Sequence, residues 1–245
     1  MSLCFFCDGF RYNVVMLRWL TQTVDFPATA SALHEPAGLL AAGGELTVPW
    51  LLAAYRQGVF PWFNEASSPI LWWSPDPRMA LLPEQLHVPR SLERVLRQQR
   101  FHVRYDTAFE AVIRGCAAAP RVGQGGTWIG EKMIAAYIAL HEAGYAHSVE
   151  AWQGNVLVGG LYGVVLGQTF FGESMFALAA DASKVAFVTA VRQMRERGMV
   201  ELIDCQMYTE HLARFGAREM PRVEFEQRLS HALATTTNGW IEKMA

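Results

Sequence analysis

The chain has 245 residues, of which 51% are hydrophobic and 18% are charged, and its formal net charge is −2. This length and composition fit one large domain or two small ones with a substantial core, and they exclude a largely disordered chain. The near-neutral charge excludes a global basic field, so a nucleic-acid partner would have to bind through a local patch.

The cysteines are too scattered to form a disulfide framework. Cys4 and Cys7 make a lone C-x-x-C motif without the second pair that a zinc site needs, and Cys116 and Cys205 stand apart. We therefore expect a reducing, cytoplasmic setting.

The first part of the chain is poor in helices. Residues 1–15 match no regular element, and we expect them to be an extension that is non-native or disordered. The first clear helix spans Pro49–Gln57, because proline is tolerated in a first turn and Gly58 provides a stop.

A segment rich in tryptophan and proline follows at residues 60–78, FPWFNEASSPILWWSPDPR. Its four prolines fix φ and remove backbone donors, which argues against a helix and against a core strand. The segment is therefore predicted to be a stiff, irregular path that presents Trp62, Trp72 and Trp73. Such a path either lines a site or packs between two domains.

We place a domain boundary near Ser74–Pro75. This gives a small N-terminal domain at residues 16–74 and a larger domain at residues 75–245.

The larger domain alternates between helices and strands. The expected order is loop and short strand within Arg78–Pro89, helix Ser91–Gln99, strand Phe101–Tyr105, helices Phe109–Ala117 and Glu131–Glu142, strands Ala146–Trp152, Val156–Leu166 and Phe170–Phe176, a helix from Asp181 or Ser183 to Arg197, strand Leu202–Gln206, helices His211–Phe215 and Glu224–Leu233, and a frayed tail from Thr235. This order indicates an α/β (α+β) domain whose central, mostly antiparallel sheet is flanked by helices.

Two features of this domain have simple explanations. The uncharged run between Glu150 and Glu173 is long enough to cross a membrane, but its glycines, amides and β-branched residues indicate two buried strands instead. The glycine-rich loop Gly123–Gly126 lacks the Lys-Ser/Thr ending of a P-loop.

The string LIDCQ at Leu202–Gln206 is the first candidate for chemistry. Strand alternation places Asp204 and Gln206 on one face. A carboxylate in so apolar a strand is costly unless it is paired or used, and with Gln206 it can orient and deprotonate a nucleophile. The alternative is a structural aspartate held by backbone donors.

The string FFGESMF is the second candidate. It places Glu173 among aromatic residues and methionine, where a buried carboxylate would seek a cation; the alternative is a glutamate that faces solvent. Cys205 with His147 or His211 as base would suit a cysteine hydrolase, but no spacing fixes that pair and a small buried cysteine is the simpler interpretation.

Nucleic-acid contacts are suggested by two further groups. Arg90, Arg94 and Arg97 recur at helical spacing, as a solvated helix face or a track for phosphates would. Trp62 and Trp128 each lie beside a turn residue and are candidate platforms for stacking a base.

Ten strings occur in an order that resembles the leucyl/phenylalanyl-tRNA–protein transferases: FPWF, PILWWSPDPR, GTWI, AHSVE, LVGGLYGV, FFGESMF, ASK, LIDCQ, HLARFGA and PR-x-x-F. The resemblance covers Glu35 to Phe225. It implies transfer of leucine, phenylalanine or methionine from aminoacyl-tRNA to the N-terminal Arg or Lys of a protein, which marks that protein for degradation by the N-end rule. It also implies a small N-terminal domain, a C-terminal domain similar to the GNAT acetyltransferases, and no metal or organic cofactor.

The resemblance also assigns roles to residues. Trp62 and Trp128 would hold the 3′-terminal adenosine, and Glu173, Asp204 and Gln206 would form the polar centre. The pocket for the transferred side chain is assigned to Leu161, Phe170, Met175 and Ile203, with Met194 as a further member.

Two other functions remain open at this point. A small-molecule acyltransferase on the same scaffold would need a phosphate-cradling turn for a CoA-type donor, for which Gly123–Gly126 is the candidate. A non-catalytic RNA-binding module would use the tryptophans and the arginine face.

Overall fold

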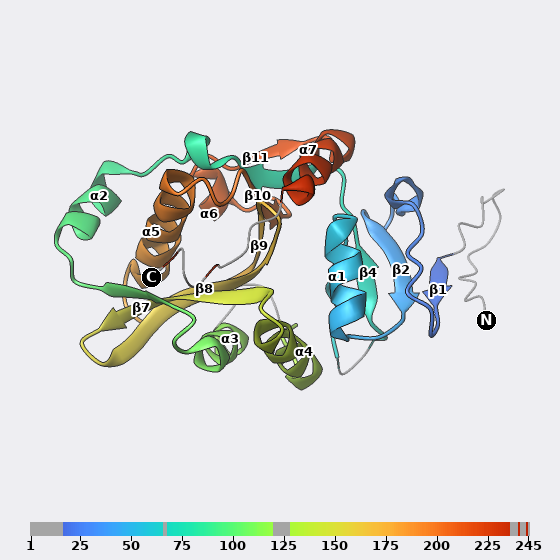
Figure 1. Ribbon diagram of the computed structural model, residues 1–245, viewed down its shortest axis with the longest axis horizontal. Helices are drawn as coiled ribbons and strands as arrows, with labels where there is room; N and C mark the ends of the chain where they lie inside the picture. The colour runs from blue at the N-terminus through green and yellow to red at the C-terminus, as the bar shows by residue number, and fades with distance from the viewer. Residues whose placement is uncertain (1–16, 66–67, 120–127, 236–239, 241–243, 245) are drawn as a thin grey trace.

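The computed structural model describes residues 17–65, 68–119, 128–235, 240 and 244, which form two neighbouring β-sheets with helices around them (Figure 1). The expectations for residues 1–15, including the C-x-x-C pair, and for Gly123–Gly126 fall outside the described residues. The division into two domains stays a prediction, although the sheets do separate between residues 73 and 78.

The smaller sheet comes from the first part of the chain and has the spatial order β1-β2-β4-β3. Its strands are β1 (Arg18–Leu20), β2 (Leu39–Gly43), β3 (Phe60–Pro61) and β4 (Leu71–Trp73). Helix α1 (Val48–Arg56) lies against this sheet and begins with a proline in its first turn, as predicted (Figure 1). The aromatic–proline segment thus contains two short strands that its prolines had argued against. Pro61 fits because β3 is an edge strand, where a missing N–H is tolerated.

The larger sheet has the order β11-β5-β10-β9-β8-β7-β6. Its strands are β5 (Arg78–Leu81), β6 (His102–Tyr105), β7 (Ala146–Gln153), β8 (Val156–Leu166), β9 (Thr169–Ala177), β10 (Leu202–Gln206) and β11 (Arg218–Met220). The helices of this part are α2 (Arg90–Arg97), α3 (Phe109–Ala118), α4 (Glu131–Glu142), α5 (Ala182–Glu196), α6 (Glu210–Ala213) and α7 (Arg222–Ala234), and short 3-10 helices cover Thr29–Ser31 and Pro83–Gln85. Neighbouring strands pair antiparallel except β9 with β10, so the predicted α/β class with a mostly antiparallel sheet is confirmed.

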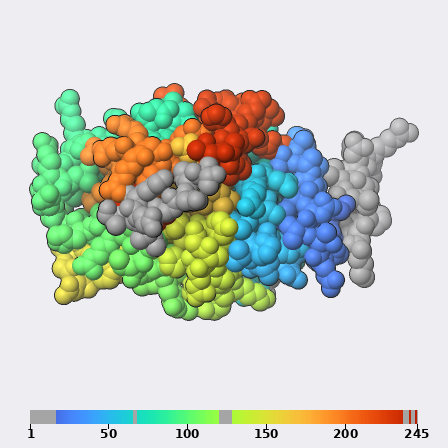
Figure 2. All heavy atoms as spheres, viewed as in Figure 1, coloured from blue at the N-terminus to red at the C-terminus, as the bar shows by residue number. Residues whose placement is uncertain are grey.

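Helices cover both faces of the larger sheet. Helices α3 and α4 pack on one face and α5 on the other (Figure 1). A Cβ atom at Gly159 on β8 would lie 2.7 Å from the Cβ of Ala182, so glycine allows α5 to approach this closely. Helix α7 contacts both the larger sheet and α1. In Figure 2 the residues near the C-terminus, drawn in red, lie against the cyan residues that belong to the first part of the chain.

The core has two parts that follow the alternation of strand β9. Phe171 belongs to a cluster that continues from the smaller sheet through α1 to α3 and α4. Phe170 points to the opposite face and belongs to a cluster between the sheet and α5. Strands β8 and β9 therefore carry apolar residues on both faces, which explains the long uncharged run in the sequence.

The tail beyond Thr235 is the clearest error in the predicted elements. It was expected to fray, yet Trp240 and Met244 are only 6% and 1% exposed. Both side chains pack into the cluster beside α5, and this apolar burial outweighs the polar composition around them. Among the described residues, no helix combines the length and the apolar character that crossing a membrane requires.

Candidate active site

The site lies where the parallel strands β9 and β10 stop pairing. Their register runs from Leu202 opposite Thr169 to Asp204 opposite Phe171 and ends there. Just beyond this point, the pairing of β9 with β8 skips Glu173, and the pairing of β10 with β5 skips Cys205. Such bulges bend a strand and turn its side chains, and they are common beside active sites.

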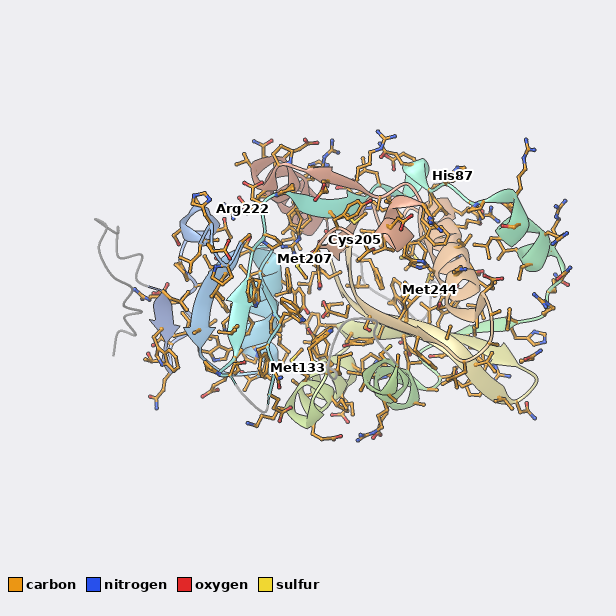
Figure 3. The ribbon with its side chains drawn as sticks, turned by 180° about the vertical axis from the view of Figure 1, so that it is seen from behind. His87, Met133, Cys205, Met207, Arg222 and Met244 are labelled. Atoms are coloured by element: carbon orange, nitrogen blue, oxygen red, sulfur yellow. The ribbon has the colours of Figure 1, made fainter. Side chains whose placement is uncertain are left out.

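A cavity of about 250 Å³ occupies this place. It is lined by Trp62, Trp128, Leu161, Phe170, Gly172, Glu173, Met175, Phe187, Ile203, Asp204, Cys205, Gln206, Met207, Thr209 and Leu212. Cys205 and Met207 mark it in Figure 3, between the smaller sheet and α5. The lining is mostly apolar, and apart from Thr209 before α6 its polar side chains lie on strands β9 and β10.

Glu173 is the centre of a buried hydrogen-bond network. Its Oε1 accepts from the Tyr55 hydroxyl at 2.7 Å and from Gln206 Nε2 at 3.0 Å, and its Oε2 accepts from the Tyr137 hydroxyl at 2.9 Å. The two tyrosine hydroxyls also bond to each other. A glutamate that faces solvent is therefore excluded, and the carboxylate is held by neutral donors instead of the predicted cation.

Burial dominates the titration of this network. It disfavours the charged carboxylate and raises the pKa of Glu173 to about 7, although the tyrosine hydrogen bonds oppose the shift. Burial likewise raises the pKa of Tyr55 and Tyr137 well above the usual value, and the Glu173 charge adds to this. Both tyrosines therefore stay protonated donors, while Glu173 can exchange a proton near neutral pH.

Asp204 is committed to a buried ion pair. Arg78 donates from Nε to Oδ1 at 2.8 Å and from Nη2 to Oδ2 at 2.6 Å, and the two side chains are 1% and 0% exposed. The guanidinium also lies 4.8 Å from the ring centres of Phe60 and Phe225. Since both carboxylate oxygens carry charge-assisted bonds, this geometry favours the structural interpretation of Asp204 over direct proton removal from an amine.

Gln206 connects the two carboxylates. Its backbone N–H donates to Asp204 Oδ1 at 2.9 Å, and its side-chain Nε2 donates to Glu173. The residue has a φ of 63°, a left-handed conformation that is uncommon outside glycine. Because Nε2 is occupied by Glu173, the carboxamide oxygen is the group that can accept a hydrogen bond from a substrate.

The two predicted adenosine platforms, Trp62 and Trp128, both line the cavity. Trp62 is fixed by Trp73. The Trp73 indole N–H donates to the Trp62 carbonyl at 2.6 Å, and the centres of the two rings lie 5.4 Å apart. Trp72 instead stacks on Trp50 in the core of the smaller sheet. Of the three tryptophans of the aromatic–proline segment, only Trp62 reaches the cavity.

The expected apolar pocket is largely brought together. Leu161, Phe170, Met175 and Ile203 all line the cavity. Met194 is not among the described lining residues and is buried in the cluster on α5. Phe187, about two turns earlier on the same side of α5, lines the cavity instead.

The remaining candidates lie elsewhere. The exposed Arg90, Arg94 and Arg97 belong to α2, which packs on α5 and contributes nothing to the cavity wall. His147 bonds to Asp106 rather than to Cys205, and burial raises the pKa of the Cys205 thiol. A thiolate nucleophile at Cys205 is therefore disfavoured.

Sequence reasoning missed three polar partners of the site: Arg78, Tyr55 and Tyr137. Arg78 had a usable signal, since it begins the buried strand β5, whose other residues are apolar, and a buried arginine needs a carboxylate. The tyrosines had none, because each belongs to the apolar face of a helix and reads as ordinary core.

Comparison with known proteins places the chain in a family of enzymes. A family model described as leucyl/phenylalanyl-tRNA protein transferase matches residues 80–230, and the model of that protein's N-terminal domain matches residues 44–76. These two matches contain every cavity residue named above.

Curated relatives match most of the chain. A leucyl/phenylalanyl-tRNA–protein transferase of Anaeromyxobacter sp. (strain K) is 62% identical over 206 residues, which cover 84% of this chain and 88% of the relative. One from Aromatoleum aromaticum is 58% identical over 210 residues, covering 86% and 87%. A solved GCN5-related N-acetyltransferase from Kribbella flavida aligns with 69% of this chain and 60% of its own at 14% identity and a TM-score of 0.37, which is too weak for any inference.

Proposed function

Because the chain belongs to the leucyl/phenylalanyl-tRNA protein transferase family, we propose that the cavity beside Glu173 and Gln206 is its catalytic site. The chain is an enzyme that moves an aminoacyl group from aminoacyl-tRNA to a protein. The observation that carries the proposal is the cavity's division into an apolar wall and one polar centre, with two tryptophans in its lining. This is what a substrate made of an apolar side chain, a reactive ester and a nucleobase requires.

The reaction replaces one acyl bond by another. The α-amine of the acceptor attacks the ester carbon of the aminoacyl-tRNA, the bond to the 3′ oxygen of the terminal adenosine breaks, and the amine proton ends on that oxygen. The ester is already activated, so the enzyme has to supply placement and proton transfer. Placement alone is worth about 7–11 kcal/mol in favourable cases.

We assign the proton transfer to Glu173 and Gln206. The Gln206 carboxamide oxygen accepts a hydrogen bond from the attacking amine and directs its lone pair toward the ester carbon. Glu173, with a pKa of about 7, takes the amine proton and returns it to the leaving oxygen. Asp204 supports this centre through its bond to the Gln206 backbone, and Arg78 keeps Asp204 in place.

The apolar wall selects the transferred side chain. Leu161, Phe170, Met175 and Ile203 offer a smooth surface that suits leucine, phenylalanine or methionine. A side chain branched at Cβ fits less well, and such a misfit costs about 1–3 kcal/mol per methylene-sized change. Trp62 and Trp128 hold the terminal adenine by stacking.

The acceptor is a protein with an N-terminal Arg or Lys, which the transfer marks for degradation by the N-end rule. In support of a cationic acceptor, Arg78 neutralises Asp204 and leaves Glu173 as the carboxylate that can attract a cation within the cavity. Because aminoacyl-tRNA and such acceptors meet in the cytoplasm, we place the enzyme there.

A transfer assay with blocked and free acceptors tests the proposal. The protein is incubated with tRNA carrying labelled phenylalanine and a peptide that begins with Arg, and the matched control is the same peptide with an acetylated N-terminus. We expect label in the free peptide alone. Absence of transfer by the folded protein would refute the function, and transfer to the acetylated peptide would refute the α-amine as acceptor.

A further inference from the structure

The aromatic ring of Phe170 has two neighbours of different kinds. One of its sides faces the cavity, which it lines. It also stacks on Trp240, with ring centres 6.0 Å apart and an angle of 15° between the planes. Trp240 is not among the described residues that line the cavity, but its stacking on Phe170 places it directly behind one wall residue.

We propose that Trp240 is a specificity-determining residue: it backs Phe170 and so limits how far the acyl pocket can widen. The proposal rests on the assignment of this pocket to the transferred side chain. It concerns a part of the chain that the family model does not describe, since that match ends at residue 230.

The backbone of β8 is a second neighbour that restricts where the Phe170 ring can lie. A Cβ atom at Gly163 would lie 2.5 Å from Cζ of Phe170, so the ring packs directly on the glycine. A sheet backbone is rigid compared with a side chain in a terminal segment. Trp240 is therefore the neighbour whose size can set the position of the Phe170 ring.

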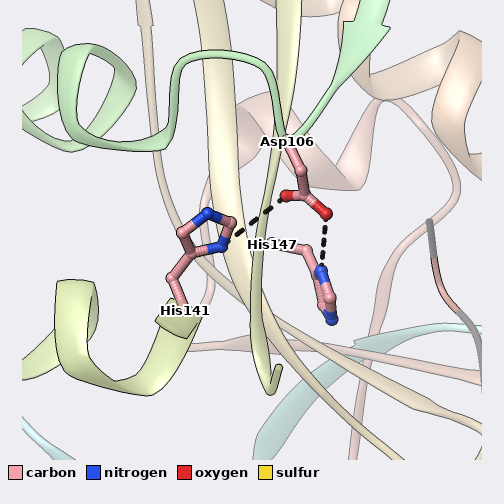
Figure 4. Close-up of side chains that lie close together, drawn as sticks. All are labelled: Asp106, His141 and His147. Atoms are coloured by element: carbon pink, nitrogen blue, oxygen red, sulfur yellow. Dashed lines mark hydrogen bonds and ion pairs between the residues drawn. The ribbon is translucent and has the colours of Figure 1, made fainter. Parts of the chain in front are cut away.

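Trp240 is itself held in place by strand β7, on the same face of the sheet as Phe170. It stacks on the His147 ring at 4.8 Å and 26°, and Asp106 fixes that ring by accepting from His147 Nδ1 at 2.7 Å (Figure 4). Asp106 also accepts from the Ser148 backbone N–H at 2.7 Å. Farther along the tail, Gln193 Nε2 donates to the Met244 carbonyl at 3.0 Å, and Figure 3 places Met244 beside α5.

The cluster of Asp106, His141 and His147 is better explained by this support than by a metal. The potential ligand atoms lie within 4.8 Å of one another (Figure 4). His141 Nδ1, however, donates to the Ala146 carbonyl at 2.8 Å, and His147 Nδ1 donates to Asp106. Because both Nδ1 atoms carry the donated hydrogen, neither Nδ1 has a lone pair to offer a metal ion beside Asp106.

Two substitutions at Trp240 separate pocket size from folding. Trp240→Ala removes the support of Phe170, and Trp240→Phe keeps a ring but shortens it. The indole N–H has no hydrogen-bond partner in the described part of the chain, so Trp240→Phe changes volume without breaking a hydrogen bond. Leu229→Ala is the matched control, because Leu229 is equally buried but belongs to the cluster on the other face of the sheet.

The readout is the ratio of kcat/KM for tryptophanyl-tRNA to that for leucyl-tRNA, with the same Arg-peptide acceptor. We expect Trp240→Ala to raise this ratio about tenfold, Trp240→Phe to raise it less, and Leu229→Ala to leave it unchanged. Unchanged ratios in both Trp240 variants, measured below their melting temperatures, would overturn the inference. If the unaltered protein transferred no leucine at all, the proposed function would fail instead.

Discussion

Replacing Arg78 by methionine is expected to destabilise the chain by about 3–5 kcal/mol, because it leaves the Asp204 carboxylate buried without a partner. The cost of breaking a buried ion pair applies here, and not the much smaller cost for an exposed pair, because Arg78 is 1% exposed and Asp204 is 0% exposed. Two hydrogen bonds of 2.8 and 2.6 Å join them. A loss of this size is a large part of the roughly 5–15 kcal/mol that holds a typical domain together.

Chemical denaturation of matched variants measures the effect. Arg214→Met makes the same substitution in an exposed pair with Glu210 and should cost no more than about 1 kcal/mol. The double variant Arg78→Met with Asp204→Leu removes both charges and should recover most of the loss. If Arg78→Met behaved like Arg214→Met, or if the double variant were no more stable than the single one, the reasoning would be refuted.

The remaining predictions concern pH dependence and substrate binding. The pKa of Glu173 is raised to about 7, so kcat/KM should rise with pH up to about 7 as the carboxylate forms. In Glu173→Gln this rise should disappear, and the remaining increase of kcat/KM should follow deprotonation of the acceptor amine, whose pKa is about 8. The raised pKa also means that the stability contributed by protonated Glu173 is complete below about pH 4.5 and is lost as the pH rises through 7, so urea titration at pH 5 and pH 8 should give a larger difference for the unaltered protein than for Glu173→Gln. Trp62→Ala should weaken binding of aminoacyl-adenosine by about 1–3 kcal/mol in calorimetry, and unchanged binding would contradict the stacking role. Replacing Arg90, Arg94 and Arg97 by glutamine should lower the salt dependence of tRNA affinity if they contact phosphates; an unchanged slope would leave them as a solvated helix face.

Asp204→Asn distinguishes a positioning residue from a base. Asparagine keeps an oxygen for the Gln206 N–H and cannot take a proton from an amine at neutral pH. The variant loses the Arg78 bond to Oδ2 and is therefore less stable, but in its folded state most of the transfer rate and the pH profile should survive. A loss of about 100-fold or more with an altered profile would restore Asp204 as the proton acceptor.

Local patterns predicted the strands and helices of the larger sheet well. Strand β10 was expected at Leu202–Gln206 and α4 at Glu131–Glu142, and both have those bounds, because alternation and helical stripes are properties of neighbouring residues. The same patterns placed Asp204 and Gln206 on one strand face and Glu173 among aromatic residues, whereas the apolar pocket beside them came from the family resemblance. They did not show that strands β9 and β10 bulge, which turns Glu173 and Gln206 toward each other.

The partners of these residues could not be found in this way. Arg78 is 126 residues from Asp204, and Tyr55 is 118 residues from Glu173. Which buried tyrosine or arginine meets which carboxylate depends on how the two sheets pack, and that is a property of the whole fold. The burial of Trp240 was missed for a related reason, since a polar tail predicts fraying unless the surface on which it packs is known.

The single-turnover rate of Gln206→Ala tests the central claim most directly. With saturating phenylalanyl-tRNA and an Arg-peptide, the chemical step should slow by about 100-fold or more, while the Kd of aminoacyl-adenosine should stay within about twofold. Gln168→Ala is the control, because that glutamine donates to the Gly198 carbonyl away from the cavity. A rate for Gln206→Ala equal to that of the control would contradict the assignment of the polar centre.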